Sequence, residues 1–175
     1  MNRKTDKDKM SKRIVIKEFE ESMLPFVVEI WNEIVKSGNA FPQTELLTEK
    51  TGFEFFKSQT FTGVACDKLT EEICGIYILH PNYVGRCSHI CNASYAVKSS
   101  FRGCHIGEAL VRHSIETAKL KNFKILQFNA VVKSNTHALN LYKKLGFKQL
   151  GTIPKGFLSK SGEYEDIIPH YLELK

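Results

Sequence analysis

The stretch SSFRGCHIG, residues 99–107, lies between a predicted strand and a predicted helix. A strand that enters a glycine-containing turn and then a helix N-terminus forms an anion site, because N–H groups point inward and the helix dipole adds about half a positive charge. Gly103 and Gly107 can adopt backbone angles closed to other residues, and Arg102 can add a charge-assisted contact. The stretch is neither a Walker loop nor a dinucleotide G-x-G-x-x-G motif. On this pattern alone, a phosphate cradle and a plain turn are both open.

Length and composition predict one globular domain. The chain has 175 residues, of which 42% are hydrophobic and 25% are charged, as in soluble domains with a proper core. We assign this domain to residues 13–175 and expect residues 1–12 to be a disordered basic leader, because no apolar segment of a secretory signal follows them. No apolar run approaches the roughly 18 residues that span a bilayer, so we predict no membrane partner. Five cysteines, an odd number inside apolar runs, predict reduced thiols in a cytoplasmic protein.

The net charge of +6 has two interpretations. It can reflect a solvated surface together with the basic leader, or attraction to a polyanionic partner. The sequence has no helix with a Lys/Arg stripe and no known nucleic-acid motif, so we predict no nucleic-acid partner. A nucleotide cofactor with several phosphates also fits the charge. The nucleic-acid alternative predicts salt-sensitive binding that survives deletion of residues 1–12.

Hydrophobic periodicity predicts alternating strands and helices. The predicted strands are residues 13–19, 60–67, 72–80, 87–97, 123–132, 147–154 and 163–174. The predicted helices are residues 21–38, 44–59, 106–121 and 135–147. Ser22 is a candidate N-cap, and Gly52 weakens the second helix. The order β-α-α-β-β-β-α-β-α-β-β favours an α/β (mixed α+β) fold with one central, mostly antiparallel mixed sheet of about seven strands and helices on both faces.

A second motif is NTHALNLYKKLGF, residues 135–147. Tyr142 follows Asn135 by seven residues, which places both on one face of the predicted helix. Asn135 is also a preferred N-cap type. Tyr142 also belongs to an apolar stripe at i, i+3, i+4 and i+7 spacing, which is usually core. The motif alone therefore leaves a structural and a functional interpretation.

Taken together, V-x-x-x-x-R-G-x-x-I-G-x-x-L at residues 97–110 and N-x-x-A-x-x-L-Y-x-x-L-G-F at residues 135–147 resemble the GNAT superfamily of acyl-CoA N-acyltransferases. The resemblance covers residues 13–174 and implies a single GNAT-type domain with the element order given above. It also implies acetyl-CoA as cosubstrate, no metal, and direct attack of an amine on the thioester in a ternary complex.

The resemblance assigns roles to particular residues. The main chain at Tyr95, Ala96 and Val97 would pair with the pantetheine arm and face the acetyl carbonyl. Asn135 would contact the pantetheine or the 3′-phosphate side, and Tyr142 would protonate the leaving thiolate, for which a phenol with a pKa near 10 is suited. The coenzyme A pyrophosphate would be held by the backbone N–H groups of Arg102, Gly103, Cys104, His105, Ile106 and Gly107. The family usually has glycine where His105 stands, which leaves the backbone angle there open.

The segments GRCSHICN at residues 85–92 and FNAVVKSN at residues 128–135 resemble azetidine-2-carboxylate acetyltransferases, and phosphinothricin acetyltransferases more loosely. This resemblance implies a small amino-acid-like amine as acceptor. Asn92 and Asn129 fall inside predicted apolar strands, where a buried amide needs partners. They can bind a polar substrate, or pair with backbone or with each other. Arg86 can face a substrate carboxylate or solvent.

Other candidate groups are weaker. Cys87, His89 and Cys91 share one face of a predicted strand, but a fourth ligand is missing and the spacing is unusual for zinc, so we predict no metal. His89 is a candidate base or a structural histidine. Further base candidates, or else surface charges, are Glu163, Glu165 and Asp166. The sequence leaves open a homodimer, a non-catalytic module that senses coenzyme A or an amino acid, and an acetyltransferase of polyamines or protein amines.

Overall fold

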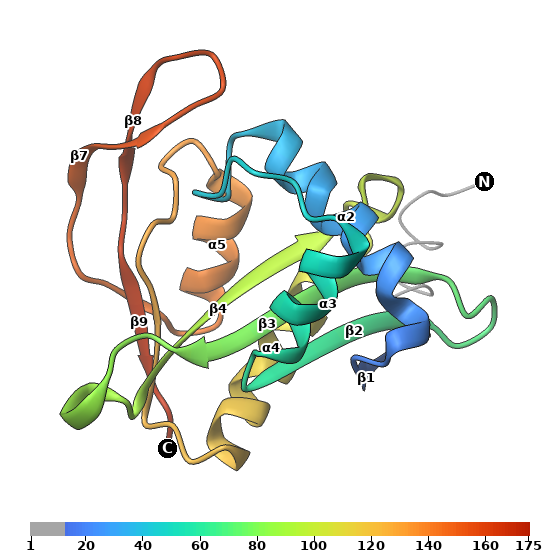
Figure 1. Cartoon of the computed structure of the whole chain (residues 1–175). Coiled ribbons are helices and arrows are strands. Elements are labelled where there is room, and N and C mark those ends of the chain that lie inside the picture. Colours follow the sequence, from blue (N-terminus) through green and yellow to red (C-terminus); the bar gives the residue numbers. More distant parts are fainter. Residues whose placement is uncertain (1–12) are drawn as a thin grey trace, which may run out of the picture. The chain divides into compact units, whose positions relative to one another are not determined.

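The computed structural model describes residues 13–175, so the predicted leader lies outside the described residues. The described chain forms two compact units. Unit 1 comprises residues 13–33, 47–79 and 94–114, and unit 2 comprises residues 34–46, 80–93 and 115–175. Figure 1 shows the elements along the chain.

The described residues contain nine strands, four α-helices and three short 3₁₀ helices. The strands are β1 (Ile14–Glu18), β2 (Phe61–Asp67), β3 (Ile73–Pro81), β4 (Ile90–Val97), β5 (Ile125–Phe128), β6 (Lys148–Gln149), β7 (Ile153–Leu158), β8 (Tyr164–Ile167) and β9 (His170–Glu173). The helices are α2 (Leu24–Ser37), α3 (Glu49–Lys57), α4 (Ile106–Leu120) and α5 (Thr136–Lys144), with η1 (Glu21–Met23), η2 (Gly85–Cys87) and η3 (Ser99–Phe101).

Seven strands form one mixed sheet in the order β1-β2-β3-β4-β5-β9-β6, and β7 and β8 form a separate hairpin. β1, β2 and β3 pair antiparallel, β4 and β5 pair in parallel, and β9 pairs antiparallel with β5 and β6. The prediction of a mostly antiparallel mixed sheet of about seven strands is therefore confirmed.

Within unit 1, helices cover both faces of the sheet, as predicted. The Thr62 hydroxyl of β2 donates to the carbonyl of Phe56 in α3 at 2.8 Å. The next residue, Gly63, points to the opposite face, where a Cβ would lie 2.2 Å from the Tyr77 ring. The Tyr77 hydroxyl is hydrogen-bonded to His113 of α4, so α3 and α4 lie on opposite faces.

The first two helices differ from their predicted bounds. Ser22 lies inside η1 and α2 begins at Leu24, so the N-cap assignment of Ser22 is wrong. α3 begins only at Glu49, because Thr48 and Thr51 form a capping box that starts the helix there. Gly52 allows α2 and α3 to pack closely, since a Cβ at this position would lie 2.6 Å from Val28 Cγ2 of α2.

Unit 2 differs more from the predictions. β4 begins at Ile90 rather than residue 87, and β5 ends at Phe128 rather than residue 132. The two predicted C-terminal strands are four shorter ones, because the chain leaves the main sheet at residues 150–168 to form the β7–β8 hairpin. β8 is also joined to the segment after β5, where Lys133 N donates to Asp166 O and Ile168 N donates to Val131 O. The hairpin tip is held by hydrogen bonds from Lys160 to the carbonyls of residues 36 and 38.

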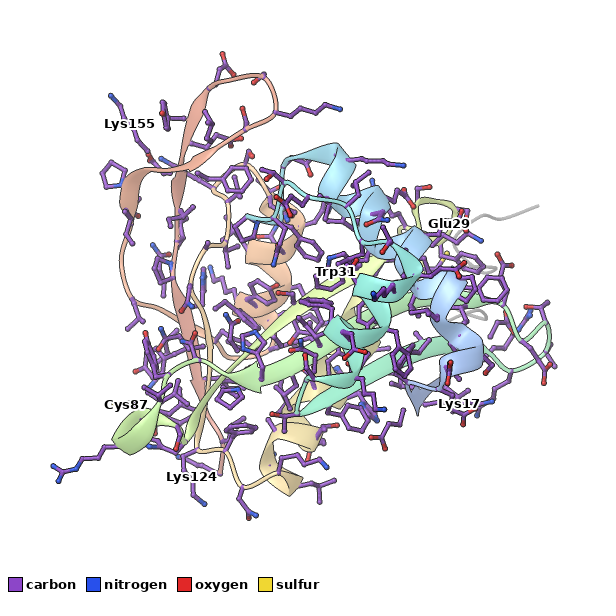
Figure 2. All side chains as sticks on the ribbon, in the orientation of Figure 1. Lys17, Glu29, Trp31, Cys87, Lys124 and Lys155 are labelled. Carbon is purple, nitrogen blue, oxygen red and sulfur yellow. The ribbon has the colours of Figure 1, made fainter. Side chains whose placement is uncertain are left out.

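All five cysteines are free thiols. Burial raises the pKa of Cys74 and Cys91 to about 12, so both are protonated at neutral pH. Figure 2 shows Cys87, which is exposed, on the loop between β3 and β4. None of the helices in residues 13–175 is both long and apolar enough to span a bilayer.

Candidate functional site

The loop between β4 and α4 lies in unit 1 and presents open backbone N–H groups. η3 turns the chain after β4, with Phe101 N donating to Lys98 O and Arg102 N donating to Ser99 O. The amide groups of Gly103, Ile106 and Gly107 donate no hydrogen bond to any described residue. The first N–H groups of a helix have no partner inside it. This loop and the start of α4 can therefore bind an anion.

His105 adopts the conformation that favours glycine. Its φ is +61°, and that of Gly103 is +77°. An L-residue in this left-handed region is strained by about 1–2 kcal/mol, and glycine is not. This angle, which the sequence left open, explains why a glycine is usual at this position in the family that the sequence resembles.

The charges around the loop are partly balanced. Arg102 is exposed, and its Nη2 lies 3.8 Å from Oε1 of Glu33. The other Glu33 oxygen accepts a hydrogen bond from Ser99 N at 3.2 Å. Arg112 is bound to Glu108 one turn away. The backbone N–H groups, rather than unpaired cations, are thus the main groups of this loop that could bind an anion.

The last three residues of β4 are Tyr95, Ala96 and Val97, and they lie in unit 1. The Tyr95 hydroxyl is hydrogen-bonded to Ser114 Oγ of α4 at 2.7 Å. Ala96 is fully buried, and its carbonyl oxygen would lie 3.0 Å from a Cβ at Gly75. The Ala96 side chain therefore belongs to the core, whereas Tyr95 is half-buried and is tied to α4 through its hydroxyl.

The buried pair Tyr77 and His113 was not predicted from the sequence. Tyr77 is fully buried, and its hydroxyl lies 2.8 Å from His113 Nδ1. Burial lowers the pKa of His113. Both rings also lie against Phe61, with centroid distances of 5.9 and 6.0 Å. Only the glycine at position 63 of the sequence hints at the close approach of Tyr77.

Tyr142 lies on α5 in unit 2, and its ring belongs to an aromatic cluster. Its ring is 4.5 Å from Phe128, 5.5 Å from Phe147 and 5.9 Å from His170, centroid to centroid. Burial raises the pKa of Tyr142 well above its usual value. The hydroxyl has no hydrogen-bond partner among residues 13–175, and no buried side-chain oxygen there lacks one. The hydroxyl must therefore reach the surface, as a protonated phenol with a free donor.

Asn135 is the N-cap of α5, as its structural interpretation predicts. Its Oδ1 accepts a hydrogen bond from Ala138 N at 3.2 Å, and its own N–H donates to Val132 O. The Nδ2 group makes no hydrogen bond to another described residue. Capping leaves this amide donor available to a ligand.

The three predicted substrate residues lie in unit 2, in different settings. Asn92 is half-buried in β4, and its side chain has no hydrogen-bond partner among the described residues. Asn129 lies just past the end of β5 and is exposed, so its placement inside an apolar strand was wrong. It pairs with the side chain of Asn82 instead. Arg86 is exposed on η2 and forms no ion pair within the described chain.

The comparisons with known proteins agree with this geometry. Residues 24–147 match the family model described as "Acetyltransferase (GNAT) family". The chain belongs to the GNAT acetyltransferase family. It is an N-acetyltransferase by this membership and by its relatives, and the sequence resemblance is confirmed.

Three proteins illustrate the relationship of this GNAT chain. The N-acetyltransferase aca1 of Schizosaccharomyces pombe is 29% identical over 148 residues, with coverage of 76% of this chain and 71% of the relative. The GCN5-related N-acetyltransferase of Kribbella flavida has a TM-score of 0.86 at 28% identity, covering 93% of this chain and 99% of that one. A phosphinothricin acetyltransferase of Sinorhizobium meliloti in complex with AcCoA has a TM-score of 0.85 at 18% identity, with coverage of 93% and 89%.

The cysteine and histidine residues at positions 87–91 of this GNAT chain do not share one strand face. Cys87 belongs to η2 and His89 precedes β4, so only Cys91 lies in the strand. The shared-face interpretation was therefore wrong. Residues 13–175 contain no group of three or more His, Cys, Asp or Glu side chains arranged to hold a metal.

The three acidic base candidates of the C-terminal hairpin lie in different surroundings. Asp166 accepts hydrogen bonds from Lys133 Nζ at 3.0 Å and from Lys155 N at 3.2 Å. The contact with Lys133 holds the pKa of Asp166 below its usual range, which makes it a poor base. Glu163 lies near the Ser161 hydroxyl in the exposed tip. Glu165 is half-buried beside Phe157 in the hairpin register.

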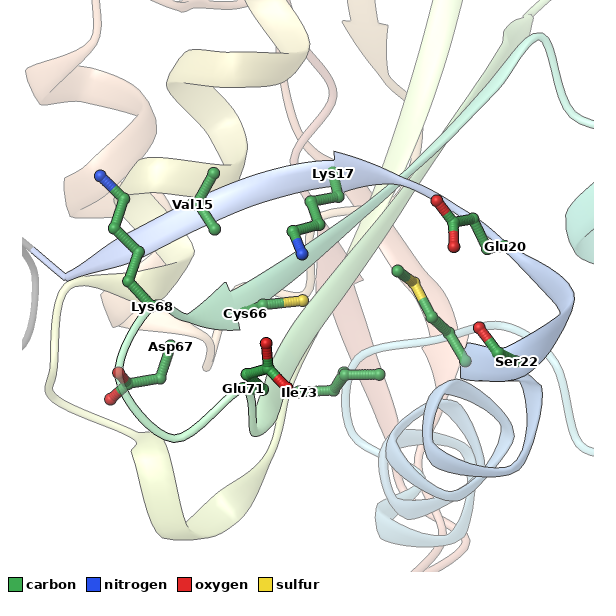
Figure 3. A pocket seen from close by; sticks show the side chains of 10 residues that line it. Val15, Lys17, Glu20, Ser22, Cys66, Asp67, Lys68, Glu71 and Ile73 are labelled. Atoms are coloured by element: carbon green, nitrogen blue, oxygen red, sulfur yellow. The ribbon is translucent and has the colours of Figure 1, made fainter.

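Unit 1 also has a hollow of about 370 Å³ beside β1 and the β2–β3 turn (Figure 3). The Lys17 side chain and the Cys66 sulfur point into it. Its most buried carboxylate, Asp67, is already bound by Arg13 and by the N–H of Leu69. None of the predicted site residues lines this hollow, so it has no part in the function proposed below.

Proposed function

We propose that this GNAT enzyme transfers an acetyl group from acetyl-CoA to the amine of a small amino-acid-like substrate. One observation supports acetyl-CoA as the cosubstrate. The start of α4 presents the unpaired N–H groups of Gly103, Ile106 and Gly107 after a loop whose left-handed angles let an anion approach the backbone. The fold of the Sinorhizobium meliloti protein, which was solved with AcCoA, supports the same use.

These residues would hold the coenzyme by the groups that remain free. The N–H groups of Gly103, Ile106 and Gly107 would bind the pyrophosphate, whereas those of Arg102 and Cys104 already donate to Ser99 O and Phe101 O. The Arg102 side chain would add a charge-assisted contact, because Glu33 holds it only at 3.8 Å. The main chain of residues 95–97 would pair with the pantetheine arm. Asn135 would contribute its Nδ2, since capping uses only its oxygen.

The acetyl thioester supplies the acyl carbon, which forms a bond to the amine nitrogen as the carbon–sulfur bond breaks. Main-chain N–H groups near Val97 would polarise the carbonyl. Tyr142 would give its phenolic proton to the departing sulfur, and the proton lost by the attacking nitrogen would pass through water to restore the phenol. The raised pKa of Tyr142 keeps the phenolic proton in place at neutral pH. The pKa of about 12 of Cys74 and Cys91 argues against a thiolate nucleophile at either of these two positions.

The acceptor proposal depends on the polar groups of unit 2. Asn92 has an unpartnered amide in β4, Asn129 stands at the end of β5, and Arg86 is a cation without a counter-ion in the described chain. The similarity in fold to two phosphinothricin acetyltransferases supports a small amino-acid-like acceptor. No carboxylate is proposed as base, and the amine would bind neutral or lose its proton to water.

Calorimetric titration of the full chain with acetyl-CoA tests the first part of this function. Saturable heat with one site is expected, and no heat would overturn the proposal. A panel of amines then tests the acceptor. Azetidine-2-carboxylate and phosphinothricin are expected to be acetylated with higher kcat/KM than polyamines or peptide N-termini. Acetylation of polyamines or peptides alone would replace the amino-acid acceptor by those amines.

A further inference from the structure

His170 is a buried histidine of unit 2 that the proposed mechanism does not use. It is the first residue of β9 and is 5% exposed. Across the sheet it faces Phe128 of β5 and Gln149 of β6, and neither residue is charged. It forms no ion pair within residues 13–175. The chemistry open to this imidazole therefore depends on its hydrogen bonds.

The hydrogen bond of His170 fixes its tautomer. Nδ1 lies 2.7 Å from the carbonyl oxygen of Ile168. A carbonyl oxygen has no proton to give, so Nδ1 must carry the proton of this bond. A ring turned by half a rotation would place a C–H group at the oxygen, and such contacts are longer, at about 3.3–3.6 Å. In a neutral imidazole with its proton on Nδ1, the other nitrogen, Nε2, has a free lone pair.

The free Nε2 of His170 reaches the surface. It has no hydrogen-bond partner among residues 13–175. Every fully buried side-chain nitrogen or oxygen in that part of the chain has a partner, so Nε2 is not fully buried. The atom can therefore accept a proton from a water molecule.

The His170 ring lies against Tyr142, the proposed acid. The two ring centroids are 5.9 Å apart, and the ring planes are inclined at 59°. Phe128, the register partner of His170, lies 4.5 Å from Tyr142 between ring centroids and directly precedes Asn129. A free proton acceptor, the proposed acid and a proposed acceptor residue thus occupy neighbouring positions within unit 2.

We propose that His170 is the proton-relay partner of Tyr142. Its Nε2 takes up, through water, the proton released by the attacking amine and returns a proton, through water, to the Tyr142 oxygen. An imidazole suits this exchange, because it takes up and releases protons near neutral pH. The inference rests on the proposed function, but it holds for any amine that the enzyme acetylates.

The relay balances every proton of the reaction. The lone pair of the amine nitrogen forms the bond to the acetyl carbon, and the nitrogen then loses one proton to water. The electrons of the broken carbon–sulfur bond stay on sulfur, which receives the phenolic proton of Tyr142. His170 accepts the amine proton at Nε2 and passes it on to the phenolate. The products are the N-acetyl amine and the coenzyme A thiol, and both side chains end in their starting forms.

The experiment compares variants that keep or remove single groups of His170 in the full chain. His170→Asn can keep a donor for Ile168 O but has no basic nitrogen. His170→Ala removes the ring, and imidazole or pyrazole is then added in solution. Pyrazole has the size and ring shape of imidazole but is a far weaker base. The matched control is His137→Asn, at an exposed histidine of α5 without a side-chain hydrogen bond in the described chain.

Acetylation of azetidine-2-carboxylate, or of spermidine if only polyamines are acetylated, gives kcat and KM for acetyl-CoA. We expect kcat to fall about ten- to a hundredfold in both His170 variants, with less than a twofold change in KM for acetyl-CoA. Imidazole should restore at least a third of the lost kcat of His170→Ala, and pyrazole should restore none. His137→Asn should behave as wild type. A normal kcat in His170→Asn, or equal rescue by both additives, would overturn the relay, since filling the space or keeping the Ile168 contact would then suffice.

A double variant tests whether His170 acts through Tyr142. In the Tyr142→Phe background there is no phenolate to restore, so His170→Asn should lower kcat by less than about threefold. A full ten- to hundredfold further loss would overturn the relay. If His170→Ala does not fold, His170→Asn and this double variant still decide the question.

Failure of the proposed function has a different signature. In that case the wild type itself would acetylate no amine of the panel, and the relay would fall with it. Normal wild-type turnover together with unchanged kcat in the His170 variants would overturn the relay alone.

Discussion

Replacing Gly107 by alanine should stabilise the fold and weaken acetyl-CoA binding at the same time. Gly107 is the second residue of α4, and a Cβ there would meet only Val97 Cγ2, at 3.9 Å. This is ordinary van der Waals contact, so the methyl group requires no repacking. Alanine is favoured over glycine in a helix by roughly 0.5–1 kcal/mol, and the free energy of unfolding should rise by about that amount.

The expected loss of binding follows from the open N–H group of the same residue. An anion held by this group must come within about 3 Å of the amide nitrogen. A methyl group on the adjacent Cα obstructs that approach. A hydrogen bond to a charged group contributes about 1.5–3 kcal/mol, so its loss should raise the Kd for acetyl-CoA about ten- to a hundredfold.

The assay pairs calorimetric titration with urea unfolding for the wild type and the Gly107→Ala variant. Gly52→Ala is the contrast, because its Cβ would lie 2.6 Å from Val28 Cγ2. That variant should lose stability while keeping its Kd for acetyl-CoA. A Kd within twofold of wild type in Gly107→Ala would refute the placement of the pyrophosphate at α4. A lower free energy of unfolding would refute the open space beside this residue.

Four further predictions follow from single contacts. In steady-state kinetics, Tyr142→Phe should lower kcat about a hundredfold or more with little change in KM for acetyl-CoA. The control Tyr164→Phe, on exposed β8, should change neither kcat nor KM. Because burial raises the pKa of Tyr142, wild-type kcat should show no alkaline loss below about pH 10. Gly63→Ala should destabilise the fold by about 1–3 kcal/mol in denaturant unfolding, since its Cβ would lie 2.2 Å from the buried Tyr77 ring. The N–H of Leu69 and the Arg13 guanidinium lower the pKa of Asp67, so its stabilising contribution is complete above about pH 4 and is lost as the pH falls through the lowered pKa. The difference in unfolding free energy between wild type and Asp67→Asn should accordingly shrink between pH 7 and pH 3. His105→Gly should be neutral or up to about 1 kcal/mol more stable in the same measurement, and His105→Val should lose about 1–2 kcal/mol, because φ at this residue is +61°.

Local sequence signals predicted the elements whose ends are set locally. Asn135 caps α5 with its own side chain, as its residue type allows. This signal lies next to the helix start that it determines. The order of strands and helices up to α5 followed for the same reason. The two motifs then identified the family, because they are far apart in the sequence and match it together.

Signals that depend on distant contacts were missed or misread. Asn129 follows an apolar run and resembles a buried strand residue, but β5 ends at Phe128, beyond which the chain pairs with residues 166–168. The reciprocal bonds of Asn82 and Asn129 join residues 47 positions apart. No local pattern encodes such a pair. Gly52 weakens a helix in isolation and is required only because Val28 approaches it.

The net charge of the chain shows how a global quantity can mislead about a local site. The described residues of unit 1, which holds the loop before α4, include eight Lys or Arg and eleven Asp or Glu. Their net charge is −3, although the whole chain carries +6. The described residues of unit 1 therefore carry no excess of positive charge that could draw a phosphate to this loop. Its affinity for an anion has to come from directed N–H groups at short range, which depend on the backbone angles of Gly103 and His105 rather than on the isoelectric point.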